Sequence, residues 1–237
     1  MITVSIVSHN HGSMLLNIVN TILKYKEVKR IVITLNVNES IPDSLKTNKI
    51  IKIIVNEKIK GFGSNHNFAF QFCETEFFCV LNPDIIFLRN IFPSLLIFFS
   101  DLKVALVAPK IIDSSGSIQD SMRKKIRIKS LFFRFFGFKI DTYFFDNSNF
   151  IEPYWVAGMF MLFRSKIYAK INGFDEKYFM YCEDIDICDK LHFLNYKIVG
   201  SLDNVAIHDA RRASHKNFNH FAWHLRSFFY YFNKKFM

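Results

Sequence analysis

Short apolar runs alternate with polar turns and amphipathic segments along the first half of the chain. Apolar residues at helical spacing predict a helix from Ser13 to about Tyr25, and a second helix is expected from Ser64 to Phe72. Five runs rich in apolar and β-branched residues predict buried strands at 2–7, 30–35, 50–55, 77–81 and 104–108. This alternation predicts an α/β fold, with a mostly parallel sheet and helices on both faces.

The second half of the chain is less regular. Residues 85–100 are strongly apolar, but Arg89, Asn90 and Pro93 interrupt the run, and a bilayer span takes about 20 apolar residues. We interpret this segment as a core helix. A buried strand is predicted at 155–163, a helix at about 184–194, and a final basic and aromatic helix at about 217–235.

Composition favours one folded unit with an anionic partner. Half of the 237 residues are hydrophobic and 29 are Phe, and no segment has the composition of a linker. We therefore expect a single domain over residues 1–212, with residues 213–237 as a C-terminal helix of the same unit. The net charge of +10 fits nucleic acid, an acidic membrane or a phosphorylated substrate. No nucleic-acid-binding motif accompanies it, so nucleic acid is not an expected partner.

Two features bear on cellular location. Met1 leads directly into the first predicted strand without a secretory signal, and the four cysteines form no C-x-x-C pair, so we expect a cytoplasmic chain. Between Arg123 and Ile140, basic residues precede a cluster of phenylalanines. This segment suits the surface of an anionic membrane, and it fits a core helix with one solvated basic side equally well.

The candidate site lies at the carboxyl ends of the predicted strands, where ligands of parallel sheets bind. Asn82-Pro83-Asp84 follows a buried strand directly, and the rigid Pro83 projects Asp84 at the end of that strand. A carboxylate there can hold Mg²⁺ or Mn²⁺ together with substrate phosphates and water. The same residue types are also typical of turns that bind nothing.

Gly61 and Gly63 precede the second predicted helix. Glycines allow close approach of the backbone, and N–H groups at a helix N-terminus can bind an anion. The spacing matches neither the dinucleotide fingerprint nor the P-loop, which argues against NAD binding and ATP hydrolysis.

Four carboxylates, Asp175, Glu183, Asp184 and Asp186, stand among apolar and aromatic residues. The helix dipole favours acidic residues in a first turn by about 0.3–1 kcal/mol, which accounts for one or two of them. It does not account for Glu183 and Asp184 directly after an aromatic run, because burial of an ionised group carries a desolvation cost. Such a carboxylate can take a proton from a substrate hydroxyl, and we favour this catalytic interpretation.

His208 follows a strand-like run, with Arg211, Arg212 and Lys216 beyond it. His208 could be a metal ligand, although a single His is more often a structural hydrogen-bonding group. The basic residues could bind a diphosphate or form a solvated loop.

Taken in order along the chain, these motifs resemble family 2 glycosyltransferases, in particular the bacterial rhamnosyltransferases that build O-antigen, lipopolysaccharide and related surface polysaccharides. The motifs are Ile6-Val7-Ser8-His9-Asn10, Gly61-Phe62-Gly63 with Asn67, Leu81-Asn82-Pro83-Asp84, Trp155-Val156-Ala157-Gly158, and Gly173-Phe174-Asp175-Glu176 through Glu183-Asp184-Ile185-Asp186. The resemblance spans nearly the whole chain. It implies the GT-A fold, a nucleotide-sugar donor, a divalent metal and an inverting transfer.

The resemblance also implies roles on the acceptor side. Asp184 matches the general base, with Glu183 and Asp186 in supporting positions. Trp155 and Gly158 match the segment that forms the acceptor pocket.

On the donor side, Asp84 matches the last position of a metal-binding Asp-x-Asp-like motif, and His208 matches a His at the metal-diphosphate site. Two positions depart from the family pattern: Leu35-Asn36 replaces an Asp-Asn pair, and Asn82 replaces the first Asp of the metal motif. Asn36 or Asn38 is then left to contact the nucleoside. The residues expected to contact the donor are Ser8, Asn10, Asn36, Gly63, Asn67, Asn82, Asp84 and Arg211.

We therefore expect an enzyme that moves L-rhamnose from dTDP-L-rhamnose to a lipid-diphosphate-linked saccharide, as a peripheral protein on the inner face of the cell membrane. In a single displacement, the base takes the acceptor proton, while Mg²⁺ or Mn²⁺ and nearby cations stabilise the leaving nucleoside diphosphate. A non-catalytic module that binds a nucleotide sugar or polysaccharide is the alternative, suggested by Leu35 and Asn82.

Overall fold

The computed structural model describes residues 1–124, 148–208 and 218–236. Its strands are β1 (Ile2–Ser8), β2 (Val28–Leu35), β3 (Ile51–Val55), β4 (Phe77–Leu81), β5 (Ile85–Ile86), β6 (Val104–Ile112), β7 (Met122–Arg123), β8 (Phe150–Ile151), β9 (Trp155–Val156), β10 (Phe160–Arg164) and β11 (Lys197–His208). Its helices are α1 (Ser13–Ile22), α2 (Asp43–Lys46), α3 (Phe62–Phe70), α4 (Phe92–Ile97), the 3₁₀ turn η1 (Phe98–Ser100), α6 (Ser165–Lys170), α7 (Glu183–Phe193) and α8 (Phe218–Phe236).

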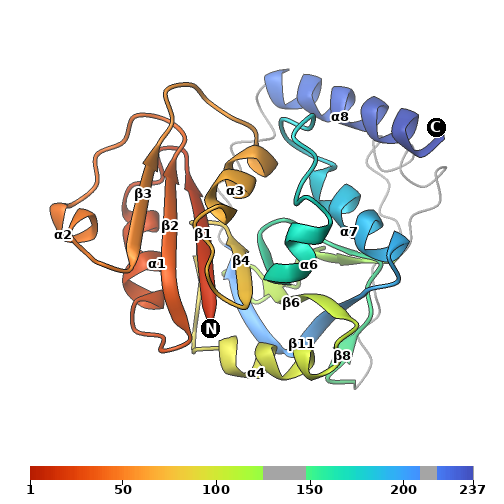
Figure 1. Ribbon diagram of the computed structural model, residues 1–237, viewed down its shortest axis with the longest axis horizontal. Coiled ribbons are helices and arrows are strands. Elements are labelled where there is room, and N and C mark those ends of the chain that lie inside the picture. The colour runs from red at the N-terminus through yellow and green to blue at the C-terminus, as the bar shows by residue number, and fades with distance from the viewer. Residues whose placement is uncertain (125–147, 209–217, 237) are drawn as a thin grey trace.

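Nine strands of the described chain form one mixed sheet in the order β3-β2-β1-β4-β10-β6-β11-β5, with β8 also paired to β11 (Figure 1). Strand β1 is parallel to β2 and β4, β2 is parallel to β3, and β6 is parallel to β11. Strand β10 runs antiparallel between β4 and β6. The predicted α/β fold, with a mostly parallel sheet flanked by helices, is confirmed.

Helices cover both faces of this sheet. On one face, α1 and α4 contribute Ile18 and Phe92 to a buried core. On the other face, α6 and α7 pack in a second core that includes Tyr168. Successive side chains of a strand point to opposite faces, so in β4 Phe78 belongs to the second core and Cys79 to the first. Burial on both faces explains why β4 is apolar along its whole length, whereas β1 also buries the small polar residues Thr3, Ser5 and Ser8.

The segment at 85–100 is not the single core helix that its apolar composition predicts. It forms β5, an irregular stretch, the short helix α4 and η1. Pro93 lies in the first turn of α4. Because proline lacks an N–H and disfavours helical backbone in the residue before it, the helix cannot extend backwards.

The expected single strand at 155–163 is also wrong. Trp155 and Val156 form β9, which pairs with β7 in a separate two-stranded sheet, and β10 begins only at Phe160. Residues 157–159 form a turn between the two sheets. This turn carries Gly158, whose missing side chain matters for the candidate site.

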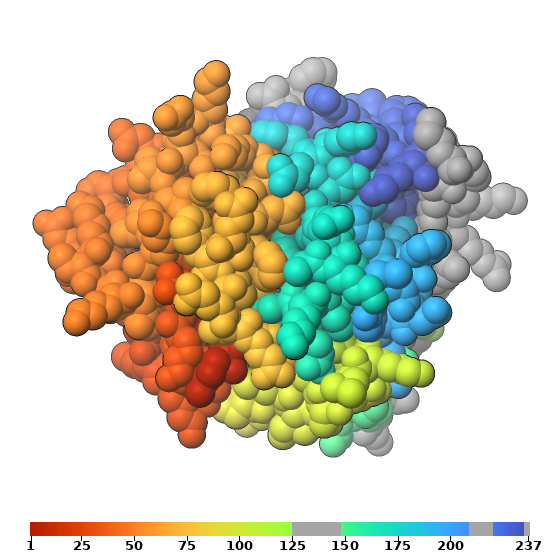
Figure 2. All heavy atoms as spheres, in the orientation of Figure 1, coloured from red at the N-terminus to blue at the C-terminus, as the bar shows by residue number. Residues whose placement is uncertain are grey.

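Helix α8 confirms the predicted C-terminal helix and lies beside α7 and the loop that precedes it (Figure 1). In the space-filling view, that loop meets α8 along the upper edge of the molecule (Figure 2). Among the described residues, no helix has both the length and the apolar character needed to cross a membrane. Of the basic and phenylalanine-rich segment at 123–140, only Arg123 and Lys124 belong to the described residues.

Candidate active site

The carboxyl ends of β1, β2 and β4 lie at one edge of the sheet, because these neighbouring strands are parallel. Ser8 stands opposite Leu35, and the N–H of Asn36 donates to the Ser8 carbonyl at 2.8 Å. Strand β4 ends at Leu81, directly before Asn82. The loops predicted to form the site therefore meet at this edge.

The loop from Ser8 to Gly12 is organised around the carboxylate of Glu39. Its Oε2 accepts from the Ser8 hydroxyl at 2.5 Å and from the N–H of Asn10 at 3.1 Å, and its Oε1 accepts from the N–H of Gly12 at 3.0 Å. Asn10 and Gly12 have positive φ angles of 61° and 55°, and such turns direct N–H groups toward one anion. The loop is thus an anion cradle that holds a carboxylate of the chain itself. No sequence motif marks Glu39 for this place.

Asn36 lies at the centre of an asparagine network. Its Oδ1 accepts from Asn56 Nδ2 at 2.9 Å and from the N–H of Lys60 at 2.9 Å, and its Nδ2 donates to the Lys60 carbonyl at 3.0 Å. Asn56 also donates to Asn65 at 2.7 Å. Asn36 is buried and fixes the loop after β3 against the end of β2.

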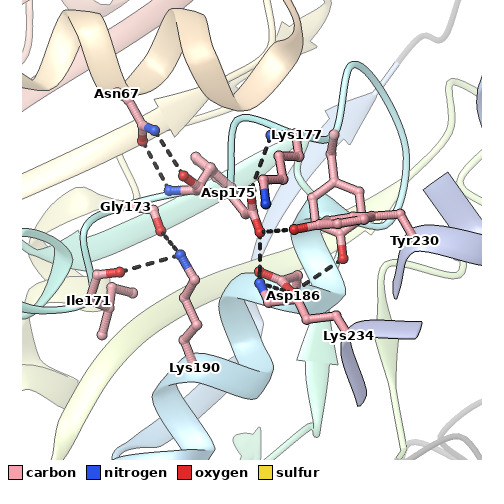
Figure 3. Close-up of polar contacts among 11 residues, drawn as sticks. Asn67, Ile171, Gly173, Asp175, Lys177, Asp186, Lys190, Tyr230 and Lys234 are labelled. Atoms are coloured by element: carbon pink, nitrogen blue, oxygen red, sulfur yellow. Dashed lines mark hydrogen bonds and ion pairs between the residues drawn. The ribbon is translucent and has the colours of Figure 1, made fainter. Parts of the chain in front are cut away.

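Gly63 and Asn67 face the loop before α7. A Cβ on Gly63 would lie 2.5 Å from the Cβ of Phe174, so close packing explains the glycine. Asn67 Oδ1 accepts from the Tyr168 hydroxyl at 2.8 Å and from the N–H of Phe174 at 2.9 Å. Asn67 Nδ2 donates to the Phe174 carbonyl at 2.9 Å and to Glu176 at 3.0 Å. Both residues attach α3 to this loop, and Figure 3 shows Asn67 facing it. Their contact with the donor stays a prediction.

Asp84 and His208, here called the metal pair, meet at the end of β4. Strand β11 pairs with β5 so that His208 stands opposite Ile85, and this register brings the imidazole beside Asp84. Its Nε2 lies 3.3 Å from Asp84 Oδ2, and the two side chains are 11% and 12% exposed. Asp84 Oδ1 is buried and has no hydrogen-bond partner among the described residues.

Gln119 sets the orientation of the His208 ring. Its Nε2 donates to the backbone carbonyl of His208 at 2.8 Å, so its Oε1 is the atom that lies 2.9 Å from Nδ1 of the ring. An amide oxygen can only accept, so Nδ1 carries the hydrogen of the neutral ring and Nε2 presents a lone pair toward Asp84. Two acceptors in contact repel each other unless a cation lies between them or Nε2 is protonated.

These residues fit a divalent metal. A buried carboxylate oxygen and a neutral imidazole, with its other nitrogen held by a hydrogen bond, are the groups that such ions use. The described residues contain no group of three or more metal-ligating His, Cys, Asp or Glu side chains. This part of the chain thus offers two ligands, to which diphosphate oxygens and water would add. Arg211, expected to contact the diphosphate, lies outside the described residues.

Glu183 and Asp184, here called the carboxylate pair, open helix α7. The preceding residues, Tyr181 and Cys182, have φ angles of 74° and 64°, which residues with a Cβ rarely adopt. Backbone of this kind persists only where the surrounding structure holds it, and it clusters at functional sites. Asp184 accepts from the N–H of Ile185 at 2.9 Å, one of the donors that a helix start leaves without an intrahelical partner.

Burial changes the acidity of the carboxylate pair. Burial and the charge of Asp184 raise the pKa of Glu183 to about 8, and Glu183 Oε2 has no hydrogen-bond partner among the described residues. Burial also raises the pKa of Asp184, against the opposing effects of the Arg123 charge and of backbone N–H groups. At neutral pH, Glu183 therefore holds a proton. The Arg123 charge and the backbone N–H groups favour the ionised form of Asp184, so Asp184 carries the negative charge of the pair.

Trp155 and Gly158 lie near the carboxylate pair. A Cβ on Gly158 would lie 3.1 Å from the Phe62 ring and 3.9 Å from the Cβ of Asp184, so a larger residue would enter the space beside the carboxylate. Trp155 is buried opposite Arg123 of β7, whose guanidinium lies 4.3 Å from the centre of the indole ring. The sequence places Arg123 in a segment that fits either a membrane surface or a core helix with a solvated basic side, and no sequence pattern indicates β7.

Two segments link the carboxylate pair to the metal pair. In the turn at 157–159, Gly158 adjoins Asp184, and the Met159 carbonyl accepts from the N–H of Asn82 at 2.9 Å. The second segment is 119–123. Its Gln119 bonds to His208, and the charge of its Arg123 acts to lower the pKa of Asp184. The arrangement has a carboxylate beside an imidazole at one end and a pair of buried carboxyl groups at the other.

Asp186 faces the opposite side of α7. It follows Asp184 by two positions, which turns its side chain by about 200° around the helix. Asp186 accepts from the Tyr178 hydroxyl at 3.3 Å and from Lys234 at 2.7 Å (Figure 3), and it lines a cavity of about 750 Å³ with other residues of α7 and α8. The structure therefore gives Asp186 a part in attaching α8, and its support on the acceptor side stays a prediction.

The sequence matches the family described as Glycosyl transferase family 2 over residues 3–171. It is 27% identical over 252 residues to the rhamnosyltransferase WbbL of Escherichia coli K12, a match that covers 99% of this chain and 94% of that protein. A stretch of 37 residues, 16% of this chain and 12% of the relative, is 46% identical to an N-acetylglucosaminyl-diphospho-decaprenol L-rhamnosyltransferase of Mycobacterium tuberculosis. These matches confirm the resemblance seen in the motifs.

Solved structures share the fold. GalNAc-T7 with UDP, GalNAc and Mn²⁺ is similar with a TM-score of 0.70 and 16% identity, over 92% of this chain and 44% of that chain. The mannosyltransferase PcManGT of Pyrobaculum calidifontis, in complex with GDP-Man and Mn²⁺, has a TM-score of 0.64 and 12% identity, over 98% of this chain and 64% of that chain. This chain spans less than two thirds of either solved chain. The likeness confirms the expected GT-A fold.

Proposed function

The chain belongs to glycosyl transferase family 2 and is a glycosyltransferase, and we propose that it transfers L-rhamnose from dTDP-L-rhamnose to a lipid-diphosphate-linked saccharide with inversion. The product belongs to O-antigen or another surface polysaccharide. The rhamnosyl assignment draws support from the rhamnosyltransferase that aligns with 99% of this chain.

One observation carries the reaction type: the turn at 157–159 connects the metal pair to the carboxylate pair. Transfer from a nucleotide sugar needs positive charge where the diphosphate leaves and a base where the acceptor attacks. The two ends of the candidate site offer these two chemistries. Gly158 keeps the space beside Asp184 free of a side chain.

The residues of this chain divide the work as follows. Asp84 and His208 would hold a divalent metal, which when bound would neutralise charge on the leaving diphosphate. Asp184 takes the proton of the acceptor hydroxyl as the bond from its oxygen to the anomeric carbon forms and the bond from that carbon to the diphosphate breaks. Attack from the side opposite the leaving group inverts the anomeric carbon. Protonated Glu183 keeps a second negative charge away from Asp184.

We assign the donor contacts to the loop of Ser8 and Asn10, to Asn36, and to Asn82 beside the metal pair, since all lie at the carboxyl edge of the sheet. Residues 213–237 form one unit with the domain at 1–212, which the bonds between α8 and the loop before α7 support. We place the enzyme in the cytoplasm at the inner face of an anionic membrane, where a lipid-linked acceptor is anchored. Nucleic acid is not among the proposed partners.

The test is transfer by the purified chain with Mn²⁺ and a synthetic lipid-diphosphate-linked N-acetylglucosamine, comparing dTDP-L-rhamnose with UDP- and GDP-sugars. We expect rhamnosylated product with an inverted anomeric configuration. Transfer from another nucleotide sugar, with none from dTDP-L-rhamnose, would overturn the donor assignment. A product with retained configuration would overturn the single displacement.

A further inference from the structure

Helix α8 has an apolar side on which two phenylalanine side chains, Phe221 and Phe229, remain exposed. Apolar residues recur every three or four positions along it, which places them on one side of the helix. We call this side the α8 face: Phe221, Ala222, Leu225, Phe228 and Phe229. Phe232, one turn further on, packs against the second core. Phe221 is 52% exposed and Phe229 is 58% exposed. A surface helix of a globular protein ordinarily turns such a side toward the core.

The opposite side of α8 bonds to the protein through polar groups. Ser227 donates to the Met180 carbonyl at 2.7 Å, and Tyr230 donates to Asp175 at 2.9 Å. Tyr231 donates to Asp189 at 2.5 Å. These contacts follow one another along the helix and line its inner side.

Lys234 completes this attachment with two ion pairs. Its Nζ lies 2.8 Å from Asp175 Oδ2 and 2.7 Å from Asp186 Oδ1 (Figure 3). The side chain of Asp186 is 5% exposed. If α8 rotated to bury its apolar side, this buried carboxylate would lose its partner, which is unfavourable. The polar attachment therefore fixes the outward direction of the α8 face.

The charge of the helix narrows the choice of partner. Helix α8 contains no acidic residue, its Arg226 is exposed, and the whole chain carries a net charge of +10. Phenyl rings enter the boundary between headgroups and acyl chains, while cations are attracted to anionic headgroups. An anionic lipid bilayer offers both, in the arrangement that this helix presents.

We propose that the α8 face is the surface through which this protein docks on an anionic membrane. This inference rests on the proposed function, because it supplies the membrane contact for a lipid-linked acceptor. The polar side of α8 is bonded to α7, the helix that opens with the carboxylate pair. Docking through α8 therefore holds the base near the membrane surface. This assigns the contact to α8, whereas sequence composition points to the segment at 123–140.

Vesicle binding by the full chain tests the proposal. The double variant Phe221→Gln/Phe229→Gln removes the exposed rings and keeps good helix formers. The matched control is Leu102→Gln, which removes an apolar side chain that is 78% exposed in the turn after α4 and η1, at the edge of the molecule away from α8 (Figure 1). Vesicles of phosphatidylglycerol and phosphatidylcholine are compared with pure phosphatidylcholine at low and high salt.

We expect wild type and Leu102→Gln to sediment with the anionic vesicles, and the double variant to bind at least about ten-fold more weakly, the loss expected when buried apolar area is removed. Vesicle binding should weaken at high salt, because salt screens exposed charges. It should also weaken with neutral vesicles, because they lack anionic headgroups. Hydrogen exchange on the wild-type chain is a second measurement that needs no variant. Anionic vesicles should slow exchange in α8 and leave α4 unchanged.

Three results would overturn the proposal. The first is that wild type binds no anionic vesicle. The second is that the folded double variant binds vesicles as wild type does. The third is that the double variant changes its oligomeric state while its vesicle binding stays unchanged. The last result would assign the α8 face to a second copy of the chain. Transfer to a short-chain, water-soluble acceptor separates the two proposals. Lost vesicle binding with unchanged transfer supports docking through α8, and a wild type that binds vesicles without transferring sugar contradicts only the proposed function.

Discussion

His208 Nε2 lies 3.3 Å from Asp84 Oδ2, and Gln119 holds the other ring nitrogen, so a lone pair of the neutral ring faces a carboxylate. With the ring neutral, the two groups repel each other, and with Nε2 protonated, they form an ion pair. Asp84 and His208 would hold a divalent cation, and the Asp84 Oδ1 atom is buried without a hydrogen-bond partner among the described residues. We therefore regard the metal pair as the end of the site that receives the diphosphate.

Replacement of Asp84 by Asn should weaken Mn²⁺-dependent binding of dTDP-L-rhamnose, because it removes the negative ligand. Replacement of Gln119 by Leu should weaken it by about 10–100-fold, the usual effect of losing the partner that orients a metal-bound His. Thermal shift of the purified chain, with and without Mn²⁺ and donor, measures both effects. Asp43→Asn, at an exposed carboxylate paired with Lys46, is the control. Equal shifts for Asp84→Asn and wild type would remove Asp84 from the metal pair.

Glu183 should make folding stability depend on pH. The pKa of Glu183 in the folded chain is about 8, above its ordinary value of 4.5, so the folded state holds this proton more tightly than the unfolded state. The corresponding stability is fully present below pH 4.5 and is lost as pH rises through about 8. Glu183→Gln cannot ionise at this position. Its melting temperature should therefore exceed that of wild type by a margin that grows as pH rises from 5 to about 9. A constant difference in melting temperature between Glu183→Gln and wild type across this pH range would show that Glu183 is not held protonated.

Lys234 should be important for attachment of α8. Lys234→Met removes the charged partner of the buried Asp186 and leaves it the Tyr178 hydroxyl at 3.3 Å. Loss of a hydrogen bond to a buried charged group costs about 1–3 kcal/mol. Lys46→Met breaks an exposed pair with Asp43, and such pairs contribute about 0–1 kcal/mol. Urea unfolding of both variants gives the comparison. Equal losses would mean that the contacts of Lys234 with Asp175 and Asp186 contribute no more than a surface pair.

Much of the fold could be predicted from local sequence, because strands buried on both faces leave runs of apolar and β-branched residues, as β1 and β4 do. The same signal fails at 85–100, where composition is apolar but Pro93 restricts the helix to a few residues. It also fails at 155–163, where one apolar run is divided between two sheets. Local patterns do not show where the chain changes sheet.

The candidate site was predictable to the extent that its residues follow strand ends or begin a helix, as Asp84 and Asp184 do. Helical geometry separates Asp186 from Asp184, although both stand in one acidic cluster. Glu39 and Gln119 could not be found, because their places depend on pairings between distant segments. The pattern of α8 predicts an amphipathic helix, but only the polar contacts of Lys234 and its neighbours show which side faces outward.

The rate of rhamnose transfer by Asp184→Asn is the most direct test of the account. This substitution keeps the shape of the side chain and removes the base, so we expect transfer to fall by about 10²–10⁴-fold while the dissociation constant of dTDP-L-rhamnose stays within a few-fold of wild type. Asp43→Asn should transfer at the wild-type rate, since Asp43 is an exposed residue of α2. Wild-type turnover by Asp184→Asn would contradict the assignment of Asp184 as the base, and with it the division of the site into a metal end and a base end.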